Sequence, residues 1–222
     1  MVRARCEAEG AVFLLGDSVD SVSPGTATLR SGRTVPFDVL VTAVGVRPAT
    51  ALACAMGLPA QRGVPTDPTG LTAIPDVYAA GDCALSHDVT TGADRVLALL
   101  PGAYMQGEVC GAAMSGAPAA PVSALPMNAM GLFGLHMITA GVCEGRDYVV
   151  RGEGTYKRLC VKDNRLMGYI LVGDVERAGI YTSLIREQTP LDTIDFELML
   201  EKPQLMAFSR REREMKLGGQ RL

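Results

Sequence analysis

Three short stretches of this chain are almost continuously apolar, which is the pattern of strands buried on both faces of a parallel sheet. They are residues 11–15, 38–44 and 77–80. Between the first two, short alternating segments flank Ser31-Gly32-Arg33, a turn sequence that predicts a β-hairpin. Helices are predicted at residues 2–9, 50–57 and 94–115, the last broken early by Pro101-Gly102. This alternation of strands and helices predicts an α/β fold for the first half of the chain.

The pattern changes after residues 117–121, whose sequence Ala-Pro-Ala-Ala-Pro is typical of a linker. Beyond it, strands are predicted at residues 148–150, 156–161 and 166–172. Asp163-Asn164-Arg165 predicts a tight turn between the last two. Residues 175–187 predict a helix, and the charged residues 208–222 predict a solvated helix or a frayed end. We therefore expect a small α+β domain in this half.

Composition excludes several classes of protein. Of the 222 residues, 48% are hydrophobic and 20% are charged, so the chain has enough apolar surface to fold. A net charge of −3 provides no electrostatic reason to bind nucleic acid or an anionic membrane. No apolar run approaches the ~20 residues that cross a bilayer, and the N-terminus lacks the apolar core of a signal peptide. We predict a cytoplasmic protein with no nucleic-acid or membrane partner.

The cysteines and histidines do not indicate a metal centre. Six cysteines are scattered along the chain without a C-x-x-C pair, which argues against a zinc site or a disulfide scaffold. We interpret them as reduced, mostly buried thiols of a cytoplasmic protein. Of the two histidines, His87 is expected in a loop and His136 in the core.

The strongest chemical signal is the pair Gly81-Asp82, which follows the apolar run at residues 77–80. Gly81 allows a sharp turn and a close approach of the backbone to a ligand. The Asp82 carboxylate can accept hydrogen bonds from sugar hydroxyls, and a helix beginning at Cys83-Ala84 offers free N–H groups to a phosphate. A bound dinucleotide needs these features. The alternative is that Asp82 is only the N-cap of that helix, which contributes ~1 kcal/mol of stability.

With their surroundings, these residues resemble the FAD-dependent pyridine nucleotide–disulfide oxidoreductases. The resemblance rests on a strand, a hairpin, Gly45-x-Arg47-Pro48, a helix, a Pro/Gly-rich loop and Thr72-x-x-Pro75-x-Val77-Tyr78-Ala79-x-Gly81-Asp82. Residues 121–190 resemble the C-terminal domain of the rubredoxin reductase and nitrite reductase large-subunit branch. The matching pieces there are Leu125-x-x-Asn128-x-Met130-Gly131 and residues 166–174. The resemblance covers nearly the whole chain.

In that family each subunit has an FAD domain interrupted by an NAD(P)H domain, followed by a C-terminal domain. The resemblance implies that residues 1–47 are the C-terminal remnant of the NAD(P)H-binding domain and that residues 48–120 are the C-terminal half of the FAD-binding domain. Residues 121–222 are then a small α+β C-terminal domain with a charged tail. The implied fold class is α/β: a partial FAD/NAD(P)-binding flavoprotein fold followed by this small domain.

The resemblance also implies which residues bind the cofactor. Asp82 binds the ribityl chain of FAD, Gly81 lets the backbone approach it, and Cys83 and Ala84 open a helix that faces the pyrophosphate. Gly45 begins the crossing between the two dinucleotide-binding domains, and Gln106 lies on a helix near the flavin ring. No catalytic acid or base is implied, because the flavin carries the reaction.

The sequence departs from the family at the phosphate-binding loops. The family has one G-x-G-x-x-G loop for FAD and one for NAD(P)H, and this chain has neither. Residues 152–157 lack the third glycine and lie between predicted strands. We therefore expect the chain to be the C-terminal half of a longer protein, truncated and by itself incomplete and inactive.

Two functions fit these expectations. The first is an oxidoreductase that passes electrons from NAD(P)H through FAD to an acceptor, by resemblance a small redox protein, oxygen, a disulfide or a reductase domain. The second is a non-catalytic dimerisation or docking module that binds no flavin by itself. In both, the strands at residues 11–15 and 38–44 lack sheet neighbours and expose apolar faces and unpaired edges. We therefore expect a homodimer, or association with a polypeptide that supplies the N-terminal half.

Overall fold

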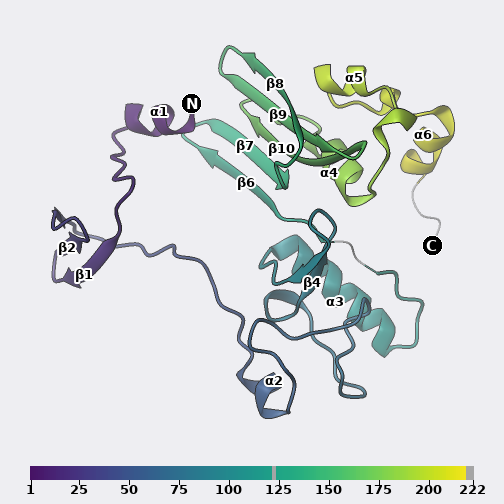
Figure 1. Cartoon of the computed structure of the whole chain (residues 1–222), viewed down its shortest axis with the longest axis horizontal. Helices are drawn as coiled ribbons and strands as arrows, with labels where there is room; N and C mark the ends of the chain where they lie inside the picture. The colour runs from purple at the N-terminus through teal and green to yellow at the C-terminus, as the bar shows by residue number, and fades with distance from the viewer. Residues whose placement is uncertain (122–123, 219–222) are drawn as a thin grey trace. The chain divides into compact units, whose positions relative to one another are not determined.

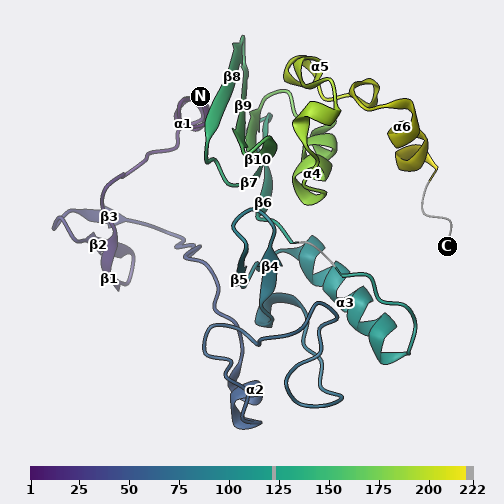
Figure 2. The ribbon, with the colours of Figure 1, turned by 45° about the vertical axis from the view of Figure 1, so that its right-hand side comes forward.

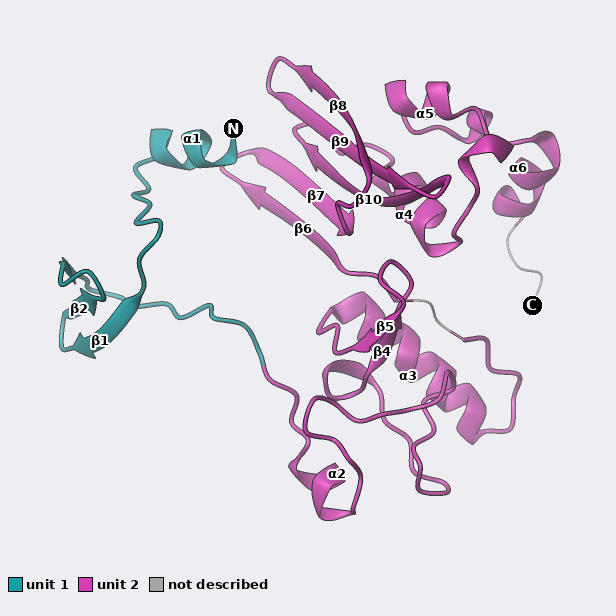
Figure 3. Ribbon diagram, viewed as in Figure 1, with its two compact units in different colours: residues 1–46 teal, residues 47–222 magenta. Residues whose placement is uncertain are grey.

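The computed structural model describes residues 1–121 and 124–218. The chain divides into two compact units, Met1–Val46 and Arg47–Leu222, which Figure 3 distinguishes by colour. This division falls inside the Gly45–Pro48 segment.

The first unit contains one helix and one small antiparallel sheet. Its elements are α1 (Val2–Ala8), β1 (Val19–Ser23), β2 (Thr26–Leu29) and β3 (Thr34–Pro36). The strands pair in the order β1-β2-β3. Gly32 adopts a positive φ of 84° in the turn between β2 and β3, a conformation that glycine reaches without steric cost. The predicted hairpin and the predicted N-terminal helix are both confirmed.

The predicted strands at residues 11–15 and 38–44 are wrong as strands, because neither segment has a ladder partner among the described residues. Most apolar side chains of both segments are exposed: Val12 and Val39 are 79% exposed, and Val44 is 93% exposed. A strand needs a neighbouring strand to satisfy its backbone N–H and C=O groups and to cover its side chains. The expected exposure of these apolar segments is confirmed.

The first part of the second unit is mostly irregular. Its elements are α2 (Ala51–Ala55), the single 3-10 turn η1 (Gly81–Cys83), β4 (Ser86–Asp88), β5 (Ala93–Arg95) and α3 (Leu100–Met114). The helix predicted at residues 50–57 is confirmed as α2. The predicted buried strand at residues 77–80 is instead an extended segment held by one antiparallel bridge between Leu71 and Tyr78. The Ala79 N–H also donates to the Gly70 carbonyl at 2.9 Å.

Helix α3 begins later than predicted. Residues 94 and 95 belong to strand β5, which pairs antiparallel with β4 and therefore cannot be helical. The helix starts at Leu100, so that Pro101 stands in its first turn rather than breaking it. Proline is favoured there because the missing N–H has no acceptor within the helix.

The second part of this unit is a five-stranded antiparallel sheet (Figure 1). Its strands are β6 (Met127–Leu132), β7 (Leu135–Gly141), β8 (Arg146–Gly152), β9 (Thr155–Lys162) and β10 (Arg165–Val172). They pair in the order β6-β7-β10-β9-β8. Asp163 and Asn164 both have positive φ, at 50° and 59°, as the two central residues of a type I′ turn require. The three predicted strands and the turn are confirmed.

Helix α4 (Ala178–Arg186) packs on one face of this sheet, as Figure 2 shows with the sheet nearly edge-on. Alternate residues of β9 and β10 and one side of α4 form the core between them. The Tyr169 hydroxyl bonds to the Thr182 hydroxyl at 2.8 Å across this interface. The largest fully buried apolar side chains of the core are Leu159, Leu166, Tyr169, Leu171, Tyr181, Leu184, Ile185 and Met199.

Short helices follow α4, and two of them, α5 and α6, are capped by the side chain of their N-cap residue. They are η2 (Leu191–Thr193), α5 (Phe196–Glu201), η3 (Leu205–Ala207) and α6 (Arg210–Leu217). The Asp195 carboxylate accepts from the Leu198 N–H at 3.0 Å, and Ser209 and Glu212 form a reciprocal capping box on α6. Lys157 Nζ on β9 donates to the Glu201 carbonyl at 2.7 Å. Of the two alternatives predicted for the charged tail, a solvated helix or a frayed end, α6 is the helix, and residues 219–222 lie outside the described residues.

Helix length bears on any membrane association. The longest helix of the described ranges, α3, has 15 residues. A helix needs about 20 apolar residues to cross the hydrocarbon core of a bilayer. No helix in the described part of the chain meets both the length and the polarity requirement.

Candidate functional site

The Gly81-Asp82 turn ends the extended segment at residues 77–80. Gly81 has a φ of 78°, so the chain reverses there in a conformation that disfavours other residues. The helix that we predicted behind Asp82 is wrong, because the single turn η1 ends at Cys83 and Ala84 is extended. The reason is tertiary: the Val64 N–H donates to the Cys83 carbonyl at 2.7 Å, and the Leu85 N–H donates to the Val64 carbonyl at 2.9 Å. Pairing with Val64 holds this segment extended.

The three residues after Gly81 have different environments. Asp82 is exposed, and in the part of the chain that the structure describes its carboxylate has no hydrogen-bond or ion-pair partner. Cys83 is half-buried, and its Sγ lies 3.5 Å from the Ala80 carbonyl, to which it donates. Ala84 is buried. Asp82 is thus the one side chain of this group that is available to a ligand.

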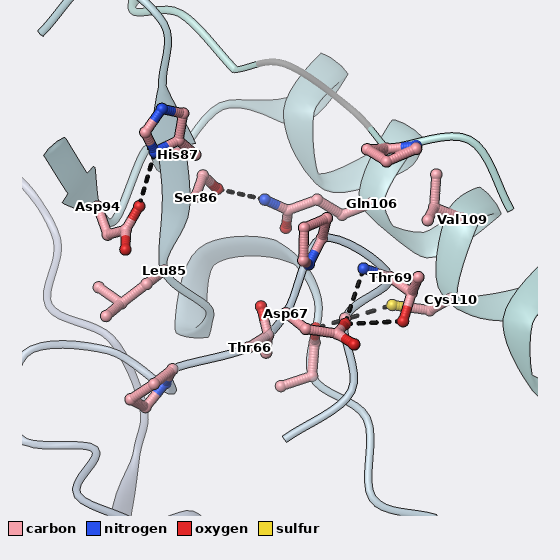
Figure 4. Close-up of a pocket in the computed structure, with 15 residues that line it drawn as sticks. Thr66, Asp67, Thr69, Leu85, Ser86, His87, Asp94, Gln106, Val109 and Cys110 are labelled. Atoms are coloured by element: carbon pink, nitrogen blue, oxygen red, sulfur yellow. Dashed lines mark hydrogen bonds and ion pairs between the residues drawn. The ribbon is translucent and has the colours of Figure 1, made fainter. Parts of the chain in front are cut away.

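Gln106 on α3 fixes the position of the turn. Its Oε1 accepts from the Gly81 N–H at 2.6 Å, and its Nε2 donates to the Ser86 hydroxyl on β4 (Figure 4). A Cβ placed on Gly81 would lie 3.5 Å from the Ala103 Cβ, so the turn also packs directly on α3. One glutamine side chain therefore ties three segments together.

Replacing Gln106 by alanine is expected to lower the free energy of unfolding by about 1–3 kcal/mol, because the half-buried Gly81 N–H loses its acceptor. Urea denaturation followed by circular dichroism measures the change. Gln61→Ala is the matched control, since Gln61 is exposed. Equal midpoints for the two variants would show that this hydrogen bond does not hold the turn.

A pocket of about 410 Å³ lies beside Gln106, between the loop at residues 65–70, strand β4 and helix α3 (Figure 4). Of the six predicted cofactor-binding residues, Gln106 lines this pocket and Gly81, Asp82, Cys83 and Ala84 do not. The sixth, Gly45, belongs to the first unit and has a φ of 90°. The structure therefore does not collect the predicted residues in one cavity.

The polar groups of the pocket are largely satisfied by one another. Asp67 accepts from the Thr69 hydroxyl at 2.7 Å and from the Thr69 N–H at 2.8 Å, and these bonds lower the pKa of its carboxyl group. Burial, and then the nearby charge of Asp67, raise the pKa of the Cys110 thiol. The Cys110 Sγ donates to the Ala79 carbonyl at 3.8 Å. The pocket thus holds a charged carboxylate and a protonated, unreactive thiol.

Strand β4 contains a buried carboxylate that the sequence analysis missed. Asp88 has no exposed surface and accepts from the Thr90 N–H at 2.8 Å, from the Thr90 hydroxyl at 2.6 Å and from Arg95 Nε at 2.8 Å. The spacing Asp-x-Thr is a sequence signal for such a turn and could have identified it. Asp88 is a structural residue, because all its partners belong to the same hairpin.

The histidines and cysteines differ in part from the predictions. His87 lies on β4 and bonds to the exposed Asp94 carboxylate at 3.0 Å, whereas His136 on β7 is exposed and not in the core. Three of the six cysteines are buried, so that "mostly buried" is wrong for half of them. In residues 1–121 and 124–218, no group of three or more His, Cys, Asp and Glu side chains is arranged to hold a metal ion.

Two family models match the sequence. One, described as pyridine nucleotide-disulphide oxidoreductase, matches residues 1–107. The other, described as the rubredoxin NAD+ reductase C-terminal domain, matches residues 126–189. The dinucleotide-binding part comes first in the chain and the C-terminal domain second, which is the order that the sequence motifs predicted.

Curated relatives identified by sequence similarity are reductases or dehydrogenase subunits, in agreement with the family models. The epsilon subunit of an NADH-dependent phenylglyoxylate dehydrogenase from Aromatoleum evansii is 32% identical over 82% of this chain and 46% of its own length. A rubredoxin-NAD(+) reductase from Pseudomonas putida is 30% identical over 61% of this chain and 37% of its own length. This chain therefore spans less than half the length of either relative.

A solved structure provides the comparison of folds. The crystal structure of a ferredoxin reductase from Rhodopseudomonas palustris superposes with a TM-score of 0.75 and 26% identity, covering 90% of this chain and 52% of the other. The fold of this chain is thus that of part of an α/β flavin- and nicotinamide-dependent reductase. The chain belongs to the pyridine nucleotide-disulphide oxidoreductase family, as its sequence motifs indicated.

Proposed function

We propose that this chain is part of an FAD-dependent oxidoreductase that passes electrons from NAD(P)H through flavin to an acceptor. Residues 1–47 are assigned to the end of an NAD(P)H-binding domain, residues 48–120 to the second half of an FAD-binding domain and residues 121–222 to a C-terminal domain. The matches to the two family models, on either side of residues 108–125, support this assignment.

The observation that carries the proposal is the state of Asp82. Its carboxylate is exposed and unpartnered within the described residues, on a turn that Gln106 holds in place. A carboxylate of this kind accepts two or more hydrogen bonds from the hydroxyl groups of a ribityl chain. Gly81 leaves the backbone without a side chain at the same turn, so that a ligand can approach it. These residues fit the polyol part of FAD.

The chain's own residues would bind and orient the cofactor, and FAD when bound would supply the two-electron chemistry. Asp82 would hold the ribityl hydroxyls, and Gly81 would let the cofactor approach the backbone. Gln106 would act as a positioning residue, because both atoms of its amide already bond to Gly81 and Ser86. Cys83 and Ala84 would support the turn by packing, and Gly45 would begin the crossing between the dinucleotide-binding domains.

A small redox protein is the acceptor that we propose. The relative from Pseudomonas putida is named for a rubredoxin acceptor, and residues 126–189 match the C-terminal domain named for the same reductases. Self-association, or association with a polypeptide that carries the phosphate-binding loops, would cover the exposed apolar side chains of residues 38–46.

The second candidate is a dimerisation or docking module without bound flavin. The exposed apolar side chains at Val39, Val41 and Val44 favour it, because an exposed cluster of this kind usually meets another surface. This candidate predicts a folded, colourless protein that self-associates, and the flavin experiment separates it from the reductase.

Titration of FAD with this protein, followed by the quenching of flavin fluorescence, tests the proposal. We expect saturable binding, and replacing Asp82 by alanine should weaken it at least about tenfold, the effect of losing one charge-assisted hydrogen bond. Glu108→Ala is the control, because it removes another exposed carboxylate, on α3. Bleaching of the bound flavin by NADH would then separate a reductase from a flavin-binding module. Equal affinities of the Asp82 and Glu108 variants would refute the role of Asp82.

A further inference from the structure

Two cysteines of the C-terminal sheet stand out because nothing in the proposed reductase function uses them. Cys160 lies on β9 and has no exposed surface. Cys143 is exposed and lies in the connection between β7 and β8. The two residues are 17 positions apart in the sequence, so they form no local cysteine motif.

The backbone places the connection at residues 142–145 directly against the strands beside Cys160. Gly168 on β10 is the ladder partner of Cys160, and a Cβ placed on Gly168 would lie 2.4 Å from the Val142 carbonyl oxygen. A Cβ placed on Gly145 would lie 2.3 Å from the carbonyl oxygen of Val161. Both contacts require glycine. They hold the connection that contains Cys143 against Gly168, the ladder partner of Cys160, and against Val161, the next residue after Cys160 in the chain.

The side chains around the two sulfurs form one cluster. The Cys143 thiol and the Asp147 carboxylate are both close enough to the Cys160 thiol to shift its pKa, and Asp147 is the ladder partner of Cys160 on β8. Asp147 in turn accepts from Arg158 at 2.8 Å. Burial, and then the hydrogen bond with Cys143, raise the pKa of Cys160. Cys160 is therefore a protonated thiol that lies next to an exposed one.

We propose that Cys143 and Cys160 form a reversible dithiol–disulfide pair that exchanges with low-molecular-weight disulfides. The exposed thiol is the one that a small disulfide can reach, and the buried thiol is the one that resolves the adduct. Asp147 is placed to receive the proton that Cys160 loses. The proposal concerns a site outside the Gly81-Asp82 turn and does not depend on flavin binding.

With oxidised glutathione the exchange balances in two steps. The Cys143 thiolate attacks one glutathione sulfur, the glutathione S–S bond breaks, and one glutathione leaves as a thiolate that takes up a proton. Cys160 then attacks the Cys143 sulfur and passes its proton to Asp147, while the disulfide bond between Cys143 and the second glutathione breaks. That glutathione leaves as a thiolate, which takes up the proton from Asp147. The two protein thiols have lost two electrons and two protons, which the two molecules of glutathione have gained.

Incubation with oxidised glutathione, followed by alkylation and peptide mapping by mass spectrometry without reductant, tests this inference. We expect a linked pair of peptides containing Cys143 and Cys160, the loss of two hydrogens from the protein mass, and full reversal by reduced glutathione. Cys143→Ser should abolish the link and leave Cys160 unmodified in the folded protein. This variant changes an exposed side chain, so its folding is not at risk.

Cys54→Ser is the matched control, because Cys54 is also exposed but lies on α2, and the linked peptides should form in it as in the unmodified sequence. A stable glutathione adduct on Cys143 with Cys160 still alkylatable in the denatured protein would overturn the proposal. So would a disulfide between two molecules through Cys143 with no intramolecular link.

Discussion

Replacing Leu184 by alanine is expected to lower the free energy of unfolding by about 2–5 kcal/mol, because it leaves a cavity in a closely packed core. Leu184 lies on α4 with no exposed surface and faces the sheet among Tyr169, Leu171 and Met199. Alanine is a better helix former than leucine, so the loss cannot come from helix propensity. Urea denaturation monitored by circular dichroism measures the change as a lower midpoint.

Leu217→Ala provides the control for this prediction. This variant has the same leucine-to-alanine substitution at a helical position, but the Leu217 side chain is 71% exposed on α6. Surface substitutions of this kind usually change stability by no more than about 0.5 kcal/mol. A Leu184 variant as stable as the Leu217 variant would mean that α4 does not pack on the sheet.

Replacing Asp88 by alanine is expected to lower the free energy of unfolding by about 1–3 kcal/mol for each of the two buried Thr90 donors that lose their acceptor. The Arg95 side chain is 43% exposed, so water can solvate its guanidinium in this variant. The carboxylate has no exposed surface and bonds to Thr90 and to Arg95, so its loss leaves the two Thr90 donors without an acceptor. Strand β4 also adjoins the beginning of the C-terminal part through a bridge between Asp88 and Ala124. The loss should therefore destabilise the whole second unit.

Asp94→Ala in the same hairpin is the control. Asp94 pairs with His87, but the two side chains are 66% and 62% exposed, and exposed pairs of this kind contribute about 0–1 kcal/mol. Denaturation midpoints of the two variants at neutral pH measure the difference. Similar midpoints would contradict the structural role assigned to Asp88.

The pH dependence of stability provides an independent test of Asp88. Burial by itself raises the pKa of this carboxyl group, but the hydrogen bonds from Thr90 and Arg95 outweigh burial, so the net shift is downward. A lowered pKa in the folded state contributes stability above the unfolded pKa of about 3.9 and loses it as the pH falls through the folded pKa. The unmodified protein should therefore lose more stability than the Asp88 variant on acidification below about pH 4.

Part of the C-terminal sheet could be predicted closely because its signals are local. Asp163 and Asn164 tolerate the positive φ of a type I′ turn, and the strands on either side pair with each other across that turn. Two strands that follow each other in the chain can pair antiparallel across a short turn, without a strand from a distant part of the sequence. Strands β8, β9 and β10 and helix α4 were therefore predicted from residue pattern alone, whereas β6 and β7 were not predicted as strands.

The apolar segments near the N-terminus show where residue pattern is insufficient. Residues 11–15 and 38–44 have the composition of buried parallel strands, but a parallel strand exists only beside another strand. The described residues contain no such partner for either segment, and their valines are exposed. The residue pattern indicated that these segments could form buried strands. Without a partner strand among the described residues, both segments are irregular.

The sequence by itself determined the family, the position of the Gly81-Asp82 turn and the tight turn between β9 and β10, because each depends on residues close together in the chain. Only the tertiary structure decided that pairing with Val64 holds the chain extended after Cys83 and that Gln106 holds Gly81. It also decided that Cys143 meets Cys160. These are contacts between residues 17 or more positions apart, and such contacts are set by backbone packing that no local pattern encodes.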